Sequence, residues 1–143
     1  MATNLTLSPR MIRTFLLDRC AADNFLLDEV EMDDEMLDLA MLLTVDRYNN
    51  TTPILDEGYT PYSFPYVGEM LLGITAHLLR SKGLNLQRNA LALTSTSGTA
   101  VDDKGAKSRV YLDLSEKYFQ QFEDRIKPLK MNVNVQGGFG FVL

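Results

Sequence analysis

The sequence contains few of the residues on which most protein chemistry depends. It has one cysteine, Cys20, and one histidine, His77, in 143 residues. A single cysteine cannot form an internal disulfide, so a reducing, cytoplasmic origin is the default expectation. A single histidine cannot build a catalytic triad or a zinc site alone. We expect Cys20 to be a buried structural thiol and His77 to be a packed helix residue.

Long hydrophobic runs are also missing. A membrane-spanning helix needs roughly 18 or more consecutive apolar residues. The longest candidate, residues 66–79, is interrupted by Glu69 and His77. The first eleven residues contain no apolar segment of the kind found in signal peptides. The sequence therefore predicts neither a membrane span nor a secretion signal.

Motifs for catalysis and cofactor binding are not found either. The terminal GGFG lacks the lysine and the following helix of a phosphate-binding loop, and residues 102–105 lack the remaining ligands of a calcium loop. Asp33, Asp34 and Glu35 look like a metal cluster, but acids also favour the start of a helix. We therefore expect no enzyme, no catalytic residue, no metal site and no cofactor.

The charge that is present is unevenly distributed. The chain is long enough for one domain, and its net charge is -5. Residues 18–57 contain twelve acids and two bases, whereas the rest contains seven acids and twelve bases. This division suits ordered association with copies or partners, although solvated loop and cap residues would also produce it. The acidic balance argues against sequence-specific binding of nucleic acid.

The first half of the chain predicts two helices. Ser8 is a suitable N-cap and Pro9 a suitable first residue for a helix over about 9–20. Asp33 is expected to cap a second helix, which is apolar over most of its surface. Such a helix is buried in its own domain or against a neighbour. Residues 49–65, rich in proline and tyrosine, then predict a long ordered connection.

The second half predicts two further helices. Pro65 begins an apolar helix that we expect to stop at Gly83. Residues 84–101 predict a loop or a short hairpin. Asp102 or Asp103 caps the last helix, which we expect to end at Pro128. Its apolar stripe consists of Val110, Leu114, Tyr118, Phe122 and Ile126, widened by Tyr111 and Phe119.

The C-terminal segment LKMNVNVQGGFGFVL has a different pattern. Apolar and polar residues alternate over 131–136, which predicts a strand. A lone strand must pair within the domain, with another copy or with another protein. Pairing with residues 84–93 or packing on the chain's own helices is the alternative to docking on a partner. The candidate partner-binding residues are Met131, Val133, Val135, Phe139, Phe141, Val142 and Leu143.

The predicted fold is thus mainly α. It is a bundle of about four helices with a long loop rich in aromatic residues and proline, followed by an extended, strand-like C-terminal tail. The predicted division is a helical domain over residues 1–129 and a docking tail over residues 130–143.

Four segments together resemble the head–tail connector, or adaptor, proteins of tailed bacteriophages. These segments are SPRMIRTFLLDR, DDEMLDLAMLLTVDRYNNTTP, FPYVGEMLLGITAHLLRS and FEDRIKPLKMNVNVQGGFG. The resemblance covers most of the chain, and it lies in the organisation of the segments. It implies a structural virion protein in the neck, assembled in the host cytoplasm.

The resemblance also implies partners. Connector subunits form a ring, usually of twelve copies, beneath the portal of the capsid, and genomic DNA passes through it. The expected partners are the portal protein, tail or neck proteins and other copies of the chain. The acidic stretch would face the DNA channel, where its charge would keep DNA from sticking.

Two alternative functions stay open. The first is a tail-completion, tail-terminator or baseplate component, which often contains more β-sheet than this sequence predicts. The second is a cellular helical adaptor or regulator whose tail is a short peptide ligand.

Overall fold

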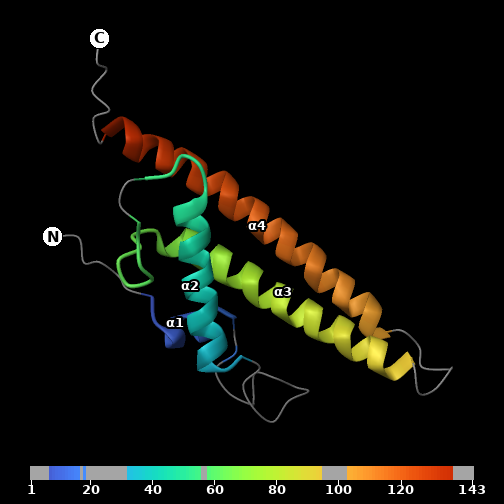
Figure 1. The fold of residues 1–143 in the computed structure, drawn as a ribbon. Coiled ribbons are helices and arrows are strands. Elements are labelled where there is room, and N and C mark those ends of the chain that lie inside the picture. Colours follow the sequence, from blue (N-terminus) through green and yellow to red (C-terminus); the bar gives the residue numbers. More distant parts are fainter. Residues whose placement is uncertain (1–6, 17, 19–31, 56–57, 95–102, 137–143) are drawn as a thin grey trace.

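Four helices make up most of the structure (Figure 1). The computed structural model describes residues 7–16, 18, 32–55, 58–94 and 103–136. The helices are α1 (Pro9–Leu16), α2 (Asp34–Asn50), α3 (Val67–Thr94) and α4 (Asp103–Gln136). No strand occurs among these described residues. The prediction of a mainly α bundle of about four helices is confirmed.

The two longest helices form an antiparallel hairpin (Figure 1). α2 crosses α3 near one end of this hairpin, and α1 lies beside the start of α2. The other end of the hairpin extends beyond α2 (Figure 1). The core therefore lies where α1, α2 and the near half of the hairpin meet. Its largest fully buried apolar side chains are Ile12, Leu37, Tyr48, Met70, Ile74, Phe122 and Ile126.

The predicted helix starts at Pro9 and at Asp33 are confirmed. Ser8 Oγ accepts a hydrogen bond from the Met11 backbone N–H over 3.4 Å. Asp33 Oδ1 accepts one from the Met36 backbone N–H over 2.7 Å, as an N-cap residue does. The carboxylate of Asp33, the first of three adjacent acids, thus satisfies a backbone N–H at the start of α2.

The contact between α3 and α4 repeats every seven residues. Ser108 Oγ donates a hydrogen bond to the Gly83 carbonyl over 2.7 Å, and Ser115 Oγ donates one to the Ala76 carbonyl over 2.9 Å. A Cβ on Gly83 would lie 2.8 Å from Leu112 Cγ. Small residues at heptad spacing therefore bring the two backbones close together.

The buried face of α4 is rotated from the predicted stripe. Val110 and Leu114, both assigned to that stripe, are 58% and 38% exposed. The buried face consists of Ser108, Ser115, Phe119, Phe122, Ile126 and Lys130. Serines can be buried here because carbonyls of α3 accept their hydrogen bonds. The stripe predicted from apolar residues alone therefore omitted both serines.

Three predicted helix ends are wrong. α1 ends at Leu16, before the predicted end at about residue 20, and Asp18 is no longer helical. α3 continues through Gly83, and α4 continues through Pro128. Gly83 is a packing residue inside α3 and not a helix end, because α4 lies too close to leave room for a side chain. Pro128 is on the exposed side of α4, so its ring does not disturb the core. Packing of the following turn against the end of α2 outweighs the lost backbone hydrogen bond.

The predicted strand over 131–136 is also wrong, because these residues form the last turns of α4. The alternation of Met131, Val133 and Val135 is short, and a helix that is already formed adds a backbone hydrogen bond with each further residue. Residues 137–143 lie outside the described part.

The connection between α2 and α3 is organised around aromatic rings. The ring of Tyr48 in α2 packs edge-on against Phe64, with centroids 4.9 Å apart, and also contacts Tyr59 and Tyr66. Asn49 holds Tyr59 at both backbone groups, over 2.8 and 2.9 Å. The described residues of this loop thus contact the end of α2 through aromatic rings and through Asn49.

Candidate functional site

α2 exposes leucines on the side away from the core. Leu39, Leu42 and Leu43 are 55%, 54% and 39% exposed. They share this side with three exposed acids at helical spacing, Glu35, Asp38 and Asp46. We call these six residues the α2 outer face. A helix that is apolar both toward the core and toward solvent offers a surface for a partner.

A shallow groove runs along the α2 outer face, between α2 and α3. It has a volume of about 140 Å³ and is lined mainly by apolar side chains, together with His77 and Ser81 of α3. Leu39 and Leu43 belong to both the groove and the α2 outer face. The groove could therefore accept a single apolar side chain from a partner bound to this face.

His77 packs as a helix residue, as predicted. Its ring meets Phe119 of α4 edge-on, with centroids 4.8 Å apart. Its Nε2 is buried and has no hydrogen-bond partner among the described residues. Burial lowers the pKa of His77 to about 4, with smaller contributions from the charges of Arg47 and Arg80. The imidazole is therefore neutral near pH 7, and it cannot act as a cationic binding group.

Arg47 links α2 to α4 through the same phenylalanine. Its guanidinium carbon lies 4.2 Å from the ring centroid of Phe119, and its Nη2 lies 2.5 Å from Glu123 Oε1. Cation–π contact and ion pairing together hold the guanidinium in place. This arginine thus has a structural role beside the groove.

The far end of the hairpin carries the opposite charge. We call residues 80–94 of α3 and 103–117 of α4 the hairpin tip. It contains seven bases and three acids. Leu84, Val110 and Leu114 are 52%, 58% and 38% exposed there. Arg88 and Arg109 are exposed as well. The hairpin tip is therefore a second surface with apolar contact groups, and its net charge is positive.

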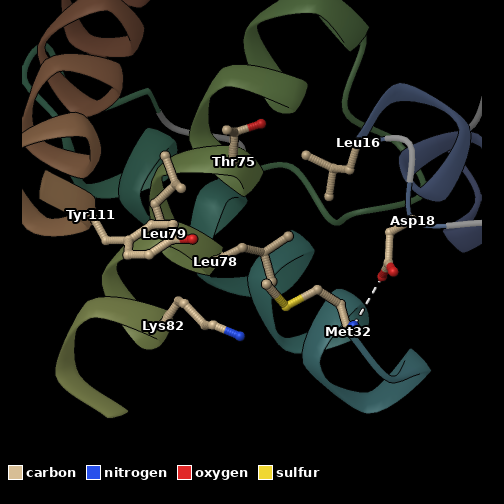
Figure 2. A pocket seen from close by; sticks show the side chains of 8 residues that line it. All are labelled: Leu16, Asp18, Met32, Thr75, Leu78, Leu79, Lys82 and Tyr111. Atoms are coloured by element: carbon tan, nitrogen blue, oxygen red, sulfur yellow. Dashed lines mark hydrogen bonds between the residues drawn. The ribbon is translucent and has the colours of Figure 1, made fainter. Parts of the chain in front are cut away.

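A second cavity lies where the end of α1 approaches α3 and α4 (Figure 2). Its volume of about 180 Å³ is below the roughly 300 Å³ of ordinary ligand sites. Asp18 in its wall accepts hydrogen bonds from the Met32 backbone N–H over 2.9 Å and from Arg13 over 3.3 Å. The Thr75 hydroxyl donates a hydrogen bond to the Leu71 carbonyl. Asp18 and Thr75 are therefore engaged within the fold, and Lys82 and Tyr111 complete the polar part of the lining.

The predicted partner-binding residues are only partly visible. Met131 is 61% exposed on α4, and Val133 is half-buried. The helix also includes Val135. The other four, Phe139, Phe141, Val142 and Leu143, lie outside the described residues, as does Cys20. The structure therefore does not bring the seven residues together as one site.

Lys130, the first residue of the predicted tail, lies in the core. Its Nζ donates hydrogen bonds to the carbonyls of Tyr48 and Thr51 at the end of α2, and it lies 4.6 Å from the Tyr48 ring centroid. Burial lowers the pKa of this ammonium group. A cation at the C-terminal end of a helix is stabilised by the helix dipole. Lys130 therefore joins α4 to α2.

The leucines of the α2 outer face are the candidate interaction residues that sequence reasoning did not single out. The signal was present, because α2 was recognised as apolar over most of its surface. Amphipathicity alone could not show which side faces the core. Within the described residues, no helix is long and apolar enough to cross a membrane. No three His, Cys, Asp or Glu side chains gather as metal ligands in that same part of the chain.

Comparisons with known proteins give no further guide. No family model, no curated protein and no solved structure matches this chain.

Proposed function

We propose that this chain is a structural subunit of the head–tail connector of a tailed bacteriophage. In this proposal, copies of the chain form a ring, in the usual case of twelve, between the portal and the tail. Genomic DNA passes through the ring during packaging and ejection. The protein would be assembled in the host cytoplasm and would remain in the neck of the virion.

One observation carries the proposal. α2 buries one side in its own core and exposes three leucines, each at least 39% accessible, on the other side. The sequence left open whether this helix is buried in its own domain or against a neighbour. An apolar face beyond the core favours a subunit that completes its burial by assembly. The resemblance of four segments to connector proteins favours a ring as the form of this assembly.

The helical content bears on the first alternative. Tail-completion, tail-terminator and baseplate components are often richer in β-sheet, and the described residues contain four helices and no strand. This difference favours a connector subunit. A cellular helical adaptor fits the same helices, and gene position separates it from the virion protein.

The test has a genomic and a biochemical part. The gene is expected to lie between genes for capsid and tail proteins. The full chain, co-expressed with the portal protein encoded nearby, is expected to co-purify with it and to add a ring of density below the portal in electron micrographs. A gene far from virion genes, or a portal that purifies without this chain, would contradict the proposal.

A further inference from the structure

We infer that the α2 outer face of one copy of this chain binds the hairpin tip of the next copy. This inference rests on the proposed function and deepens it by naming the two surfaces through which subunits associate. It commits to a second copy of this chain as the occupant of the α2 outer face.

Both surfaces have the apolar groups that an interface needs. The α2 outer face offers Leu39, Leu42 and Leu43, and the hairpin tip offers Leu84, Val110 and Leu114, all at least 38% exposed. Removal of such side chains from water favours association. The groove beside α2 adds room for one protruding side chain. Association would therefore remove both exposed patches from water.

Charge selects the pairing. α2 with its cap residue Asp33 contains five acids and one base, and the three charged residues of the α2 outer face are all acids. The hairpin tip contains seven bases and three acids. Two α2 outer faces would repel each other, and so would two hairpin tips. Contact between unlike surfaces is favoured, and complementary charge also fixes the orientation of the partners.

The position of the two surfaces determines the type of assembly. α2 crosses the hairpin near one end, and the hairpin tip is the opposite end (Figure 1). The two surfaces adjoin at Ser81, which lines the groove, whereas the exposed Arg88 and Leu84 lie further along α3. Each copy therefore presents an acidic surface on α2 and a basic surface beyond it. Contacts between different surfaces are heterologous, and they give a closed ring when the rotation between neighbours closes.

The experiment uses two charge-reversed forms of the full chain. Asp38→Lys with Asp46→Lys makes the α2 outer face basic, and Arg88→Glu with Arg109→Glu and Lys117→Glu leaves the hairpin tip with four bases and six acids, which makes it acidic. All five side chains are exposed, so both forms are expected to fold like the wild type, which circular dichroism checks. Assembly is measured by analytical ultracentrifugation and native mass spectrometry.

Each form alone is expected to assemble at least about tenfold more weakly than the wild type, because like charges then face each other. An equimolar mixture is expected to regain assembly, with the two forms alternating. Leu42→Ser is also expected to weaken assembly. Phe15→Ser is the matched control, because Phe15 of α1 is 52% exposed, close to the 54% of Leu42, but lies outside both surfaces, and it is expected to have no effect on assembly.

Several results would overturn the inference: wild-type assembly in either charge-reversed form, no recovery in the mixture, or a wild-type chain that stays monomeric. Portal binding by a monomeric chain would leave the proposed function standing. Conversely, a wild-type dimer that responds to the charge reversals as described would support the inferred interface and contradict the proposed ring.

Discussion

At the scale of single residues, two glycines of α3 have opposite surroundings. A Cβ on Gly73 would lie 2.3 Å from Thr44 Cγ2, whereas a Cβ on Gly68 would meet nothing within 4 Å. Thr44 is buried, and its hydroxyl donates to the Ala40 carbonyl over 2.7 Å, so its side chain has little freedom to move. Gly73 therefore sets how closely α2 can approach α3.

We expect Gly73→Ala to destabilise the protein. Overpacking costs about 1–3 kcal/mol, and the better helix propensity of alanine offsets up to about 1 kcal/mol of it. Gly68→Ala is the matched control and is expected to be neutral or stabilising by up to about 1 kcal/mol. Urea denaturation measures both variants. Equal stability of the two would show that the contact with Thr44 is not restrictive.

His77 makes stability depend on pH. Its pKa is about 4 in the folded chain against 6.5 for an exposed histidine. Between these two pH values the unfolded chain therefore binds more protons than the folded chain. The stability that a neutral His77 provides is fully present above pH 6.5, and the free energy of unfolding decreases as the pH falls toward 4. Because the ring is only partly buried, we expect this loss to be on the order of 2 kcal/mol.

The variant His77→Leu isolates this effect. Carboxylates titrate in the same range, but they do so in both proteins. The free energy of unfolding of the variant is therefore expected to fall less steeply than that of the wild type between pH 6.5 and 4. Parallel curves in urea denaturation across this range would contradict a neutral, buried His77.

At the scale of the elements, one lysine joins the ends of two helices. Lys130 of α4 donates hydrogen bonds to the backbone carbonyls of Tyr48 and Thr51 at the end of α2. Lys130→Met keeps most of the side-chain volume but removes these hydrogen bonds. We expect a loss of about 1–3 kcal/mol, because buried carbonyls lose a charged donor. The exposed Lys127, mutated to Met, is the matched control and should change thermal stability little. Similar melting temperatures for both variants would argue against this role.

At the scale of the whole molecule, the position of Lys130 changes where the chain can be shortened. Deletion of residues 130–143 would remove a core residue together with the predicted tail. Deletion of residues 137–143 removes four of the seven candidate partner-binding residues and leaves α4 complete. We expect this shorter deletion to keep the contacts of Lys130 and to abolish co-purification with the portal, because the resemblance to connector proteins implies that the C-terminal segment docks on the portal or on a neighbouring subunit. Normal portal binding by the shortened chain would contradict the docking role of the tail.

Local chemistry made several parts of the fold predictable. Ser8 and Asp33 were recognised as helix starts because a side-chain oxygen can satisfy backbone N–H groups that lack a partner in the helix. His77 was recognised as a packed residue from the apolar residues around it. The aromatic loop was recognised because three prolines prevent a continuous helix.

Contacts between distant segments were not predictable in this way. Ser108 and Ser115 are polar residues, yet they lie in the α3–α4 seam because carbonyls of another helix accept their hydrogen bonds. Gly83 and Pro128 looked like helix ends, but packing against neighbouring helices carries α3 and α4 through them. The short alternation after Lys130 is typical of a strand, but these residues continue α4.

The sequence by itself determined the helical class, two helix starts and the division of charge along the chain, because these depend on neighbouring residues and on composition. Only the tertiary structure decided which side of α2 faces solvent, how α4 is rotated against α3 and where Lys130 lies. These features depend on which distant groups satisfy each other's burial and hydrogen bonds. The exposed leucines that carry the proposed interface belong to this second group.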